Sequence, residues 1–295
     1  MPGILSAVIT VLAWGTWLAP SQNISFKNQQ IKTFYVAAAN LGLAVVVFVF
    51  QGFGGLTWEV FWLPFLGGLV WAISGFLAFT ATDHLGAARA YGIWTPVNVV
   101  VSILWGAVIF GEFLTAGPLT LVLLVASLAI LITGVLLIIF AKGFGGQSQS
   151  KAVLWAGLLS ALGAGVLWGT YFIPIKLSAA SMWVAAFPLS VGIFTGSATL
   201  AALTRQPLRL KGTSEYLRVA STGLLWGIGN YGMLLLVEQL GAGRGFTISQ
   251  LGMVVNGLVG VYLLKDPQPR SHAATLTLVG CLLASLGGIL LGSLK

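Results

Sequence analysis

The sequence predicts an all-α polytopic membrane protein whose ten transmembrane helices form two inverted five-helix repeats. Three observations predict this fold: an apolar composition, ten long apolar runs and an internal repeat. The chain is 58% hydrophobic and only 7% charged, and its mean hydropathy is +0.99. Soluble domains carry about 25% charged residues, so a soluble fold with this composition would lack a polar surface.

Ten apolar runs are each long enough to cross the hydrocarbon core, which takes about 20 residues. Continuous runs of this length satisfy their backbone hydrogen bonds as helices, whereas barrel strands are shorter and alternate in polarity. The predicted spans are 2–20, 34–51, 60–81, 88–110, 118–141, 152–174, 181–203, 216–237, 244–264 and 273–294. The first run has no basic n-region and no small-residue cleavage site, so we expect a retained span rather than a signal peptide.

An internal repeat relates the two halves of the chain. Residues 83–91 read Asp-His-Leu-Gly-Ala-Ala-Arg-Ala-Tyr, and residues 238–246 read Glu-Gln-Leu-Gly-Ala-Gly-Arg-Gly-Phe. A second match relates the Trp-Gly-Thr-Trp sequence that starts at Trp14 to the Trp-Gly-Thr-Tyr sequence that starts at Trp168. Each half holds five spans, an odd number, so the second half enters the membrane in the opposite sense. This inverted arrangement is typical of transporters.

The Gly-rich segment 143–151 is the predicted linker between repeat units 1–142 and 152–295, within one integral membrane domain. Lys and Arg concentrate in or beside the loops that follow the odd-numbered spans. These residues are Lys27, Lys32, Arg89, Lys142, Lys151, Arg205, Arg209, Lys211, Arg218, Lys265 and Arg270. Because basic loops stay in the cytoplasm, we expect the odd-numbered loops inside and both termini outside.

Several classes of function are excluded by the sequence. The net charge of +8 resides in loops, where it sets orientation and does not indicate nucleic-acid binding. Cys281 is the only cysteine, so an internal disulfide and a cysteine-based metal site are both excluded. No His, Asp or Glu cluster has metal-ligand spacing, and no phosphate-binding loop or nucleophile elbow is present. We therefore expect no metal, no cofactor and no enzyme activity.

Polar and aromatic residues inside the spans form the candidate site. Span four carries a stripe on one helical face, at steps of three and four residues: Tyr91, Trp94, Thr95, Asn98, Ser102 and Trp105. The predicted substrate-binding residues are Trp14, Trp17, Trp71, Tyr91, Trp94, Asn98, Trp168, Tyr171, Trp226, Asn230, Ser249, Gln250 and Asn256. The alternative is structural, because Trp and Tyr anchor helices at membrane interfaces and Ser, Thr and Asn bridge packed helices.

The chemistry of these side chains favours a neutral polyol as substrate. They are aromatic, amide or hydroxyl groups, and almost none is charged. The C–H face of a sugar packs against an indole ring while its hydroxyls bond to amides, whereas an amino acid or a phosphate calls for a buried charge or a helix terminus. All six acids map near span ends, away from the mid-membrane position expected of a proton relay. A facilitator, or a symporter that uses Asp83 or Glu238, fits this pattern.

Asp83 and Arg89 in the first half, and Glu238 and Arg244 in the second, are the predicted gating or coupling residues. One interpretation is a local salt pair within each junction, six residues apart across a turn. Exposed pairs of this kind contribute about 0–1 kcal/mol. The other interpretation is gating, because an inverted repeat places the two junctions on opposite membrane faces, where they could seal alternately.

Four stretches carry a resemblance to a known family: Ala13–Thr16, Gly111-Glu112, Trp226–Asn230 and Gly241–Gly252. Together they resemble the glucose/ribose porter family, which mediates sugar uptake within the drug/metabolite transporter superfamily, and the resemblance covers essentially the whole chain. It implies ten helices in inverted halves, sugar uptake by proton symport, and a multi-pass location in a bacterial inner (plasma) membrane.

The predicted function is secondary transport of a small neutral polyol, such as the monosaccharides glucose or ribose, by alternating access. Its expected partners are the sugar, protons and the lipid bilayer. Two alternatives stay open: a metabolite or amino-acid exporter of the same superfamily, and a non-transporting membrane subunit. Gly288 and Gly292 have the small-xxx-small spacing that lets helices approach closely, either within the bundle or in a homodimer.

Overall fold

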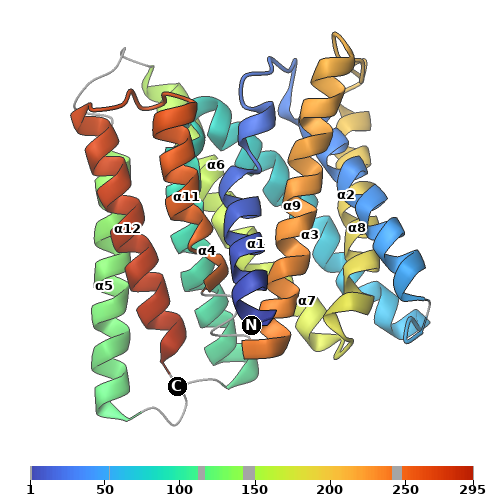
Figure 1. Ribbon diagram of the computed structural model, residues 1–295, viewed down its shortest axis with the longest axis horizontal. Coiled ribbons are helices and arrows are strands. Elements are labelled where there is room, and N and C mark those ends of the chain that lie inside the picture. The colour runs from blue at the N-terminus through green and yellow to red at the C-terminus, as the bar shows by residue number, and fades with distance from the viewer. Residues whose placement is uncertain (1, 53, 112–116, 142–149, 241–247, 295) are drawn as a thin grey trace.

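The computed structural model describes the chain at residues 2–52, 54–111, 117–141, 150–240 and 248–294. Within these ranges every regular element is helical (Figure 1). Residues 143–149 of the predicted linker, Arg244 and the side chain of Glu238 lie outside the described residues. The all-α prediction is confirmed.

The helices are α1 (Pro2–Thr16), α2 (Gln29–Gln51), α3 (Trp58–Leu85), α4 (Ala87–Phe110), α5 (Pro118–Phe140), α6 (Lys151–Thr170), α7 (Phe172–Leu177), α8 (Met182–Leu203), α9 (Thr213–Leu240), α11 (Gly252–Leu258) and α12 (His272–Ser293). Two short turns follow α1 and α11, namely the 3₁₀ turn η1 (Ala19–Ser21) and the π-helical turn η3 (Val259–Leu263). Among the described residues, nine helices are long and apolar enough to cross a membrane. The ninth predicted span, 244–264, is described only as a shorter apolar helix, Gly252–Leu263.

Polar side chains at the predicted span boundaries start several of these helices. Asn28 accepts a hydrogen bond from the Ile31 amide at 3.1 Å and caps α2. Ser271 accepts one from the Ala274 amide at 3.0 Å and caps α12. Thr57, Ser150 and Ser181 cap α3, α6 and α8 in the same way. Each cap satisfies a backbone N–H that the helix itself cannot pair.

Two prolines end α1 and α6 short of the predicted spans. Proline lacks an N–H, so the carbonyl four residues before it loses its helical partner. Pro20 lies four residues after Thr16, where α1 ends, and Pro174 lies four residues after Thr170, where α6 ends. The chain continues through a turn into η1 in one case and into α7 in the other.

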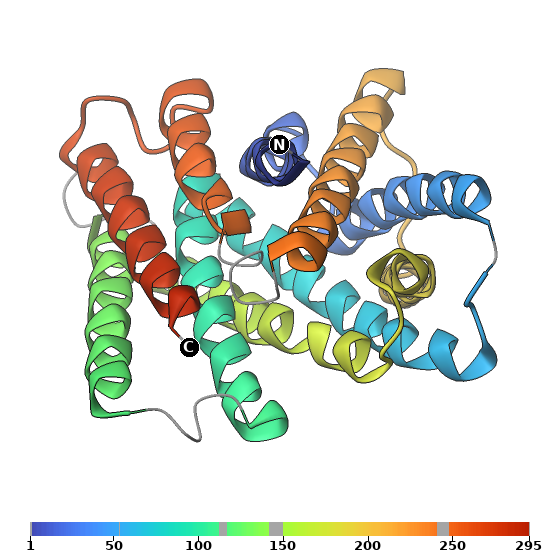
Figure 2. The same cartoon turned by 60° about the horizontal axis from the view of Figure 1, so that its bottom comes forward.

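Glycines let neighbouring helices pack backbone to backbone, and Figure 2 shows how the helices of the bundle are arranged. A Cβ added at Gly68 in α3 would lie 2.2 Å from the carbonyl oxygen of Leu189 in α8, and one added at Gly192 would lie 2.1 Å from that of Phe65. At the opposite edge of the bundle α5 packs beside α12, where Gly287 meets the backbone of Leu131. Gly288 has no such neighbour within 4 Å, so its predicted role in a homodimer stays a prediction.

Both chain ends lie on the same side of the bundle in Figure 1, and the connections after α1, α3, α8 and η3 lie on the other side. This arrangement is expected when the chain crosses an even number of times. The basic connections therefore share one face, and their cytoplasmic orientation stays a prediction from the charge bias.

Candidate functional site

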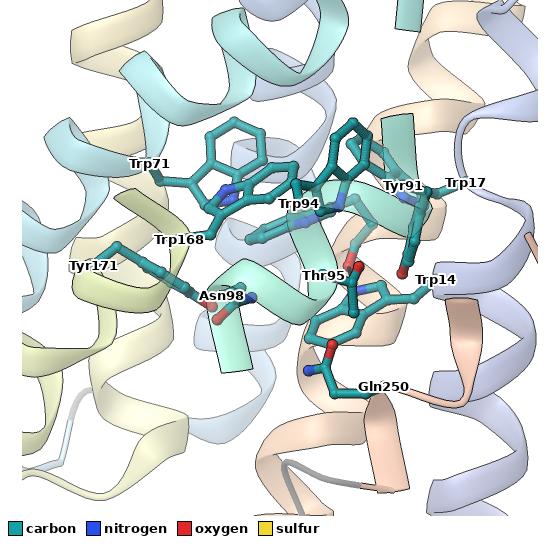
Figure 3. Close-up of a pocket in the computed structure, with 11 residues that line it drawn as sticks. Trp14, Trp17, Trp71, Tyr91, Trp94, Thr95, Asn98, Trp168, Tyr171 and Gln250 are labelled. Carbon is teal, nitrogen blue, oxygen red and sulfur yellow. Dashed lines mark hydrogen bonds between the residues drawn. The ribbon is translucent and has the colours of Figure 1, made fainter. Parts of the chain in front are cut away.

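A chamber lies at the centre of the bundle between helices of both halves (Figure 3). Its walls come from α1, α3, α4, α6 and α9, from the turns after α1 and α6 and from the turn before α11. The lining residues are Trp14, Trp17, Trp71, Tyr91, Trp94, Thr95, Asn98, Trp168, Tyr171, Trp226 and Gln250. None of these side chains carries a charge. Apart from Thr95, all of them belong to the predicted set of substrate-binding residues.

The prolines that shorten α1 and α6 also position two of the lining rings. Trp17 lies in the turn between α1 and η1, and Tyr171 lies in the turn between α6 and α7. Both side chains are nearly fully buried, although each occupies an interruption of a helix. The repeated Trp-Gly-Thr-aromatic pattern therefore places an aromatic ring beside the chamber in each half.

Trp168 contacts three of the other aromatic rings that form one wall of the chamber. Its ring centroid lies 5.2 Å from that of Trp94, 6.1 Å from that of Trp71 and 6.2 Å from that of Trp17. Trp71 in turn meets Trp226 at 4.6 Å with an interplanar angle of 61°. Tilted and edge-to-face geometries of this kind are the favourable arrangements for aromatic pairs, so the rings support one another around the chamber.

Two indole N–H groups on this wall have no acceptor among the residues that the structure describes. The Nε1 atoms of Trp71 and Trp168 are buried and without a hydrogen-bond partner among the described residues. Trp14 differs, because its Nε1 donates to the carbonyl oxygen of Trp226 at 3.1 Å and ties α1 to α9. An unpaired buried donor costs free energy, and a ligand oxygen in the chamber would remove that cost.

Amide and hydroxyl groups complete the lining. The Oδ1 atom of Asn98 accepts a hydrogen bond from Ser102 at 3.2 Å, which leaves the Asn98 amide N–H groups for the chamber. Gln250 donates through Nε2 to Ser249 Oγ at 3.3 Å, which leaves its carbonyl oxygen. Figure 3 shows Asn98 and Gln250 on the same side of the aromatic rings. The chamber thus offers donors and acceptors together.

The space that atoms leave free in the chamber is about 430 Å³, counting the part that opens to solvent. Small-molecule pockets occupy roughly 300–1,000 Å³. Only about 40 Å³ of this space is open to the centre of a water molecule, which is room for about three waters at 10–15 Å³ each. The volume of about 40 Å³ describes the room for a ligand better, because the volume of about 430 Å³ includes open solvent.

Three predicted binding residues lie outside this lining. Asn230 lines a second, smaller cavity, together with Tyr171 and apolar residues of α7, α8 and α9. Asn256 donates through Nδ2 to the Gly15 carbonyl oxygen at 3.2 Å and so joins α11 to α1. Ser249 is buried beside Gln250. Thr95 belongs to the span-four stripe and also lines the chamber. Its spacing from Tyr91 and Asn98 along the helix could have identified it as a binding residue.

The predicted local salt pair between Asp83 and Arg89 is wrong. Arg89 Nη2 lies 3.4 Å from Asp266 Oδ1, in the connection between η3 and α12, whereas Asp83 Oδ2 lies 3.9 Å from His84 Nδ1. Gly86, with φ +82°, lies between α3 and α4, and a Cβ there would lie 2.1 Å from Asp266 Oδ2. The Asp266 carboxylate therefore occupies the N-terminal end of α4, where the helix dipole favours a negative charge.

Comparison with known proteins places this chain in a family. A family model described as "Sugar transport protein" matches residues 5–294. A protein of Enterococcus faecalis that is provisionally named a sugar uptake protein is 28% identical over 99% of both chains. A Bacillus cereus protein provisionally named the glucose uptake protein GlcU is 24% identical over the full length of both.

A protein of known crystal structure has the same fold, with a TM-score of 0.61 and 19% identity over 98% of this chain and 95% of the other. The family match confirms the predicted resemblance. It also confirms the prediction that the protein is a transporter and not an enzyme. The apolar helices, together with the bacterial relatives, identify a multi-pass integral membrane protein. This chain belongs to the sugar transport protein family.

Proposed function

We propose that this protein carries a neutral monosaccharide across the membrane by alternating access, and that the central chamber binds the sugar. The observation that carries the proposal is the lining itself: uncharged, aromatic and amide-bearing, with two unpaired indole donors. The glucose uptake named for one relative favours a hexose as substrate. Proton symport is the proposed mode of coupling.

The lining chemistry suits a sugar better than a charged solute. The ring faces of Trp94 and Trp168 can pack against sugar C–H groups, while the N–H groups of Trp71 and Trp168 donate to hydroxyl oxygens. The Gln250 carbonyl oxygen can accept from a sugar hydroxyl. An amino acid would bring an ammonium and a carboxylate into this space, and no lining residue offers either of them a counter-charge. Unpaired charges are costly at membrane depth.

The small free space supports alternating access. Room for about three waters is too little for a hexose, so the aromatic rings must separate before a sugar enters. We therefore propose that the chamber widens during the transport cycle. Movement of one half of the bundle against the other would open it.

Corresponding packing contacts support an inverted repeat. Gly15 in α1 packs against Val255 and the Gly252 carbonyl oxygen in α11, and Gly169 in α6 packs against Val101 and the Asn98 carbonyl oxygen in α4. Gly68 in α3 likewise packs on the backbone of α8, and Gly223 in α9 packs on that of α2. Each contact has a counterpart in which the two halves exchange roles, as expected of a duplicated unit.

A thermal-unfolding screen tests the function. Purified protein is heated in the presence of glucose, ribose, other polyols and amino acids, one at a time. A ligand that binds only the folded state stabilises it by RT ln(1 + [L]/Kd), about 2.7 kcal/mol at a concentration of 100 Kd. We expect concentration-dependent stabilisation by a monosaccharide, and sugar counterflow in proteoliposomes. Stabilisation by amino acids alone would favour the exporter instead.

We propose that the ion pair between Arg89 and Asp266 acts as a gate at one end of the bundle. Asp266→Asn should change the rate of sugar counterflow by about 1.4- to fivefold, because exposed pairs typically contribute about 0.2–1 kcal/mol. The double variant R89D/D266R should recover part of the original rate. Counterflow is measured by uptake of labelled sugar into preloaded proteoliposomes.

Lys265→Asn is the matched control for the gate. It removes the neighbouring positive charge at a residue with φ +57°, a conformation that asparagine tolerates, and leaves the ion pair intact. Its rate should match the unaltered protein. If Asp266→Asn also transports at that rate, the pair is a structural contact and not a gate.

A further inference from the structure

Lys32 is a buried lysine that the proposed sugar site does not use. The sequence places it in the loop after the first span, but the structure places it in the first turn of α2, with an exposed fraction of 3%. Its Nζ lies 4.6 Å from the ring centroid of Phe79 and 5.7 Å from that of Phe26. No carboxylate of the described chain lies within the 4.0 Å ion-pair limit of this Nζ.

A lysine in this setting is unusual. Buried lysines are almost always paired, because an ammonium taken out of water loses its hydration and needs a compensating charge. The faces of two aromatic rings supply part of that compensation through cation–π attraction. They hold the ammonium more weakly than an adjacent carboxylate would.

Charged and titratable groups of the neighbouring helices surround this end of α2. Of the three helices packed against α2, α8 carries no titratable side chain, and α9 carries Glu215, Tyr216 and Arg218 at this end. Glu215 accepts a hydrogen bond from the Lys211 amide at 2.9 Å. Arg218 donates to the Pro20 carbonyl oxygen at 2.7 Å, and Tyr216 accepts from the Leu210 amide at 3.1 Å. On α3, Asp83 attracts the Lys32 ammonium, and its side chain is 61% exposed. His84 lies beside Asp83.

A row of aromatic rings connects Lys32 to the chamber. Phe79, which lies under the Lys32 ammonium, has its centroid 5.6 Å from that of Trp17. Trp17 lines the chamber and meets Trp168 at 6.2 Å. Cation–π attraction needs the positive charge, so loss of the proton weakens the hold on Phe79. The packing of Trp17 against the sugar space then depends on whether Lys32 is protonated.

We propose that Lys32 is the proton-coupling site of this transporter, an inference that rests on the proposed sugar transport. Its amine takes up one proton to form the ammonium on one side of the membrane. It returns to the neutral amine by releasing that proton on the other side, where Asp83 meets solvent. One proton then accompanies each sugar.

Proteoliposomes separate coupling from transport. Two quantities are measured: sugar counterflow, which needs no proton gradient, and accumulation driven by an imposed pH difference. With one proton per sugar, one pH unit limits the accumulation ratio to about tenfold. We expect Lys32→Gln to retain counterflow while its accumulation ratio falls to one. Lys27→Gln, at an exposed lysine before the same helix, should retain both.

Lys32→Arg serves as a second variant if the Gln side chain prevents folding. Its guanidinium keeps the positive charge but does not release a proton, so we expect counterflow without accumulation. Accumulation by either folded variant at the ratio of the unaltered protein would overturn the proposal. So would counterflow without accumulation in the unaltered protein, which would leave sugar transport in place. Absence of both activities in the unaltered protein would instead reject sugar transport itself.

Discussion

Trp168→Ala should weaken sugar binding by roughly 10- to 100-fold, because about 1.5–3 kcal/mol of stacking and hydrogen bonding is removed and each 1.4 kcal/mol is tenfold. The ring stands at the centre of the wall, beside Trp17, Trp71 and Trp94. Its N–H is one of the two unpaired donors. The change therefore removes a stacking face and a donor together, and the sugar Kd is measured by isothermal titration calorimetry.

Trp155→Ala is the matched control for this experiment. Trp155 lies on the same helix, α6, but is 60% exposed on the outside of the bundle. Its loss removes an indole ring of the same size without altering the chamber, so the Kd should not change. An unchanged Kd in Trp168→Ala would show that the sugar binds elsewhere. A Kd raised equally in both variants would indicate a general effect on the bundle.

Gly192→Val should destabilise the folded protein by about 3 kcal/mol or more, at or beyond the upper end of typical overpacking costs. The added Cβ would lie 2.1 Å from the Phe65 carbonyl oxygen, and Gly68 Cα lies 3.0 Å away. Both obstacles are backbone atoms of α3, so no side-chain rotation relieves the clash. We expect a lower unfolding temperature and less monodisperse protein on size exclusion in detergent.

Gly42→Ala tests whether the loss of stability expected in Gly192→Val comes from the packing clash or merely from the replacement of a helical glycine. Gly42 lies within α2, and a Cβ there would meet nothing within 4 Å. Alanine in a helix is favoured over glycine by about 0.5–1 kcal/mol, so this variant should be at least as stable as the unaltered protein. If the Gly192→Val variant is as stable as the unaltered protein, α3 and α8 can separate without loss of folding free energy.

Much of the candidate site could be predicted because spacing along one helix determines which residues share a face. Tyr91, Trp94 and Asn98 recur at steps of three and four, and all three line the chamber. The interruptions of α1 and α6 were not predicted: Pro20 and Pro174 each lie four residues after the end of a helix, but Pro64, Pro96 and Pro188 lie inside unbroken helices.

Contacts between helices could not be predicted from the spacing of residues along the sequence. Asn230 and Asn256 are as polar as Asn98, yet one lines a separate cavity and the other bonds to the Gly15 backbone. Arg89 has an acid six residues earlier in the chain, but its ion pair is with Asp266, 177 positions away. Sequence spacing relates residues on one element, whereas these partners depend on which elements pack together.

The sequence by itself determined the helical membrane fold, because the lipid core leaves no other way to pair the backbone of long apolar runs. It also determined the uncharged aromatic character of the site, since so few charged residues fall inside the spans. Only the tertiary structure decided which rings meet around one chamber and that Lys32 is buried against Phe79. The physical reason is that packing joins residues from distant helices, and close glycine contacts between backbones set how those helices lie.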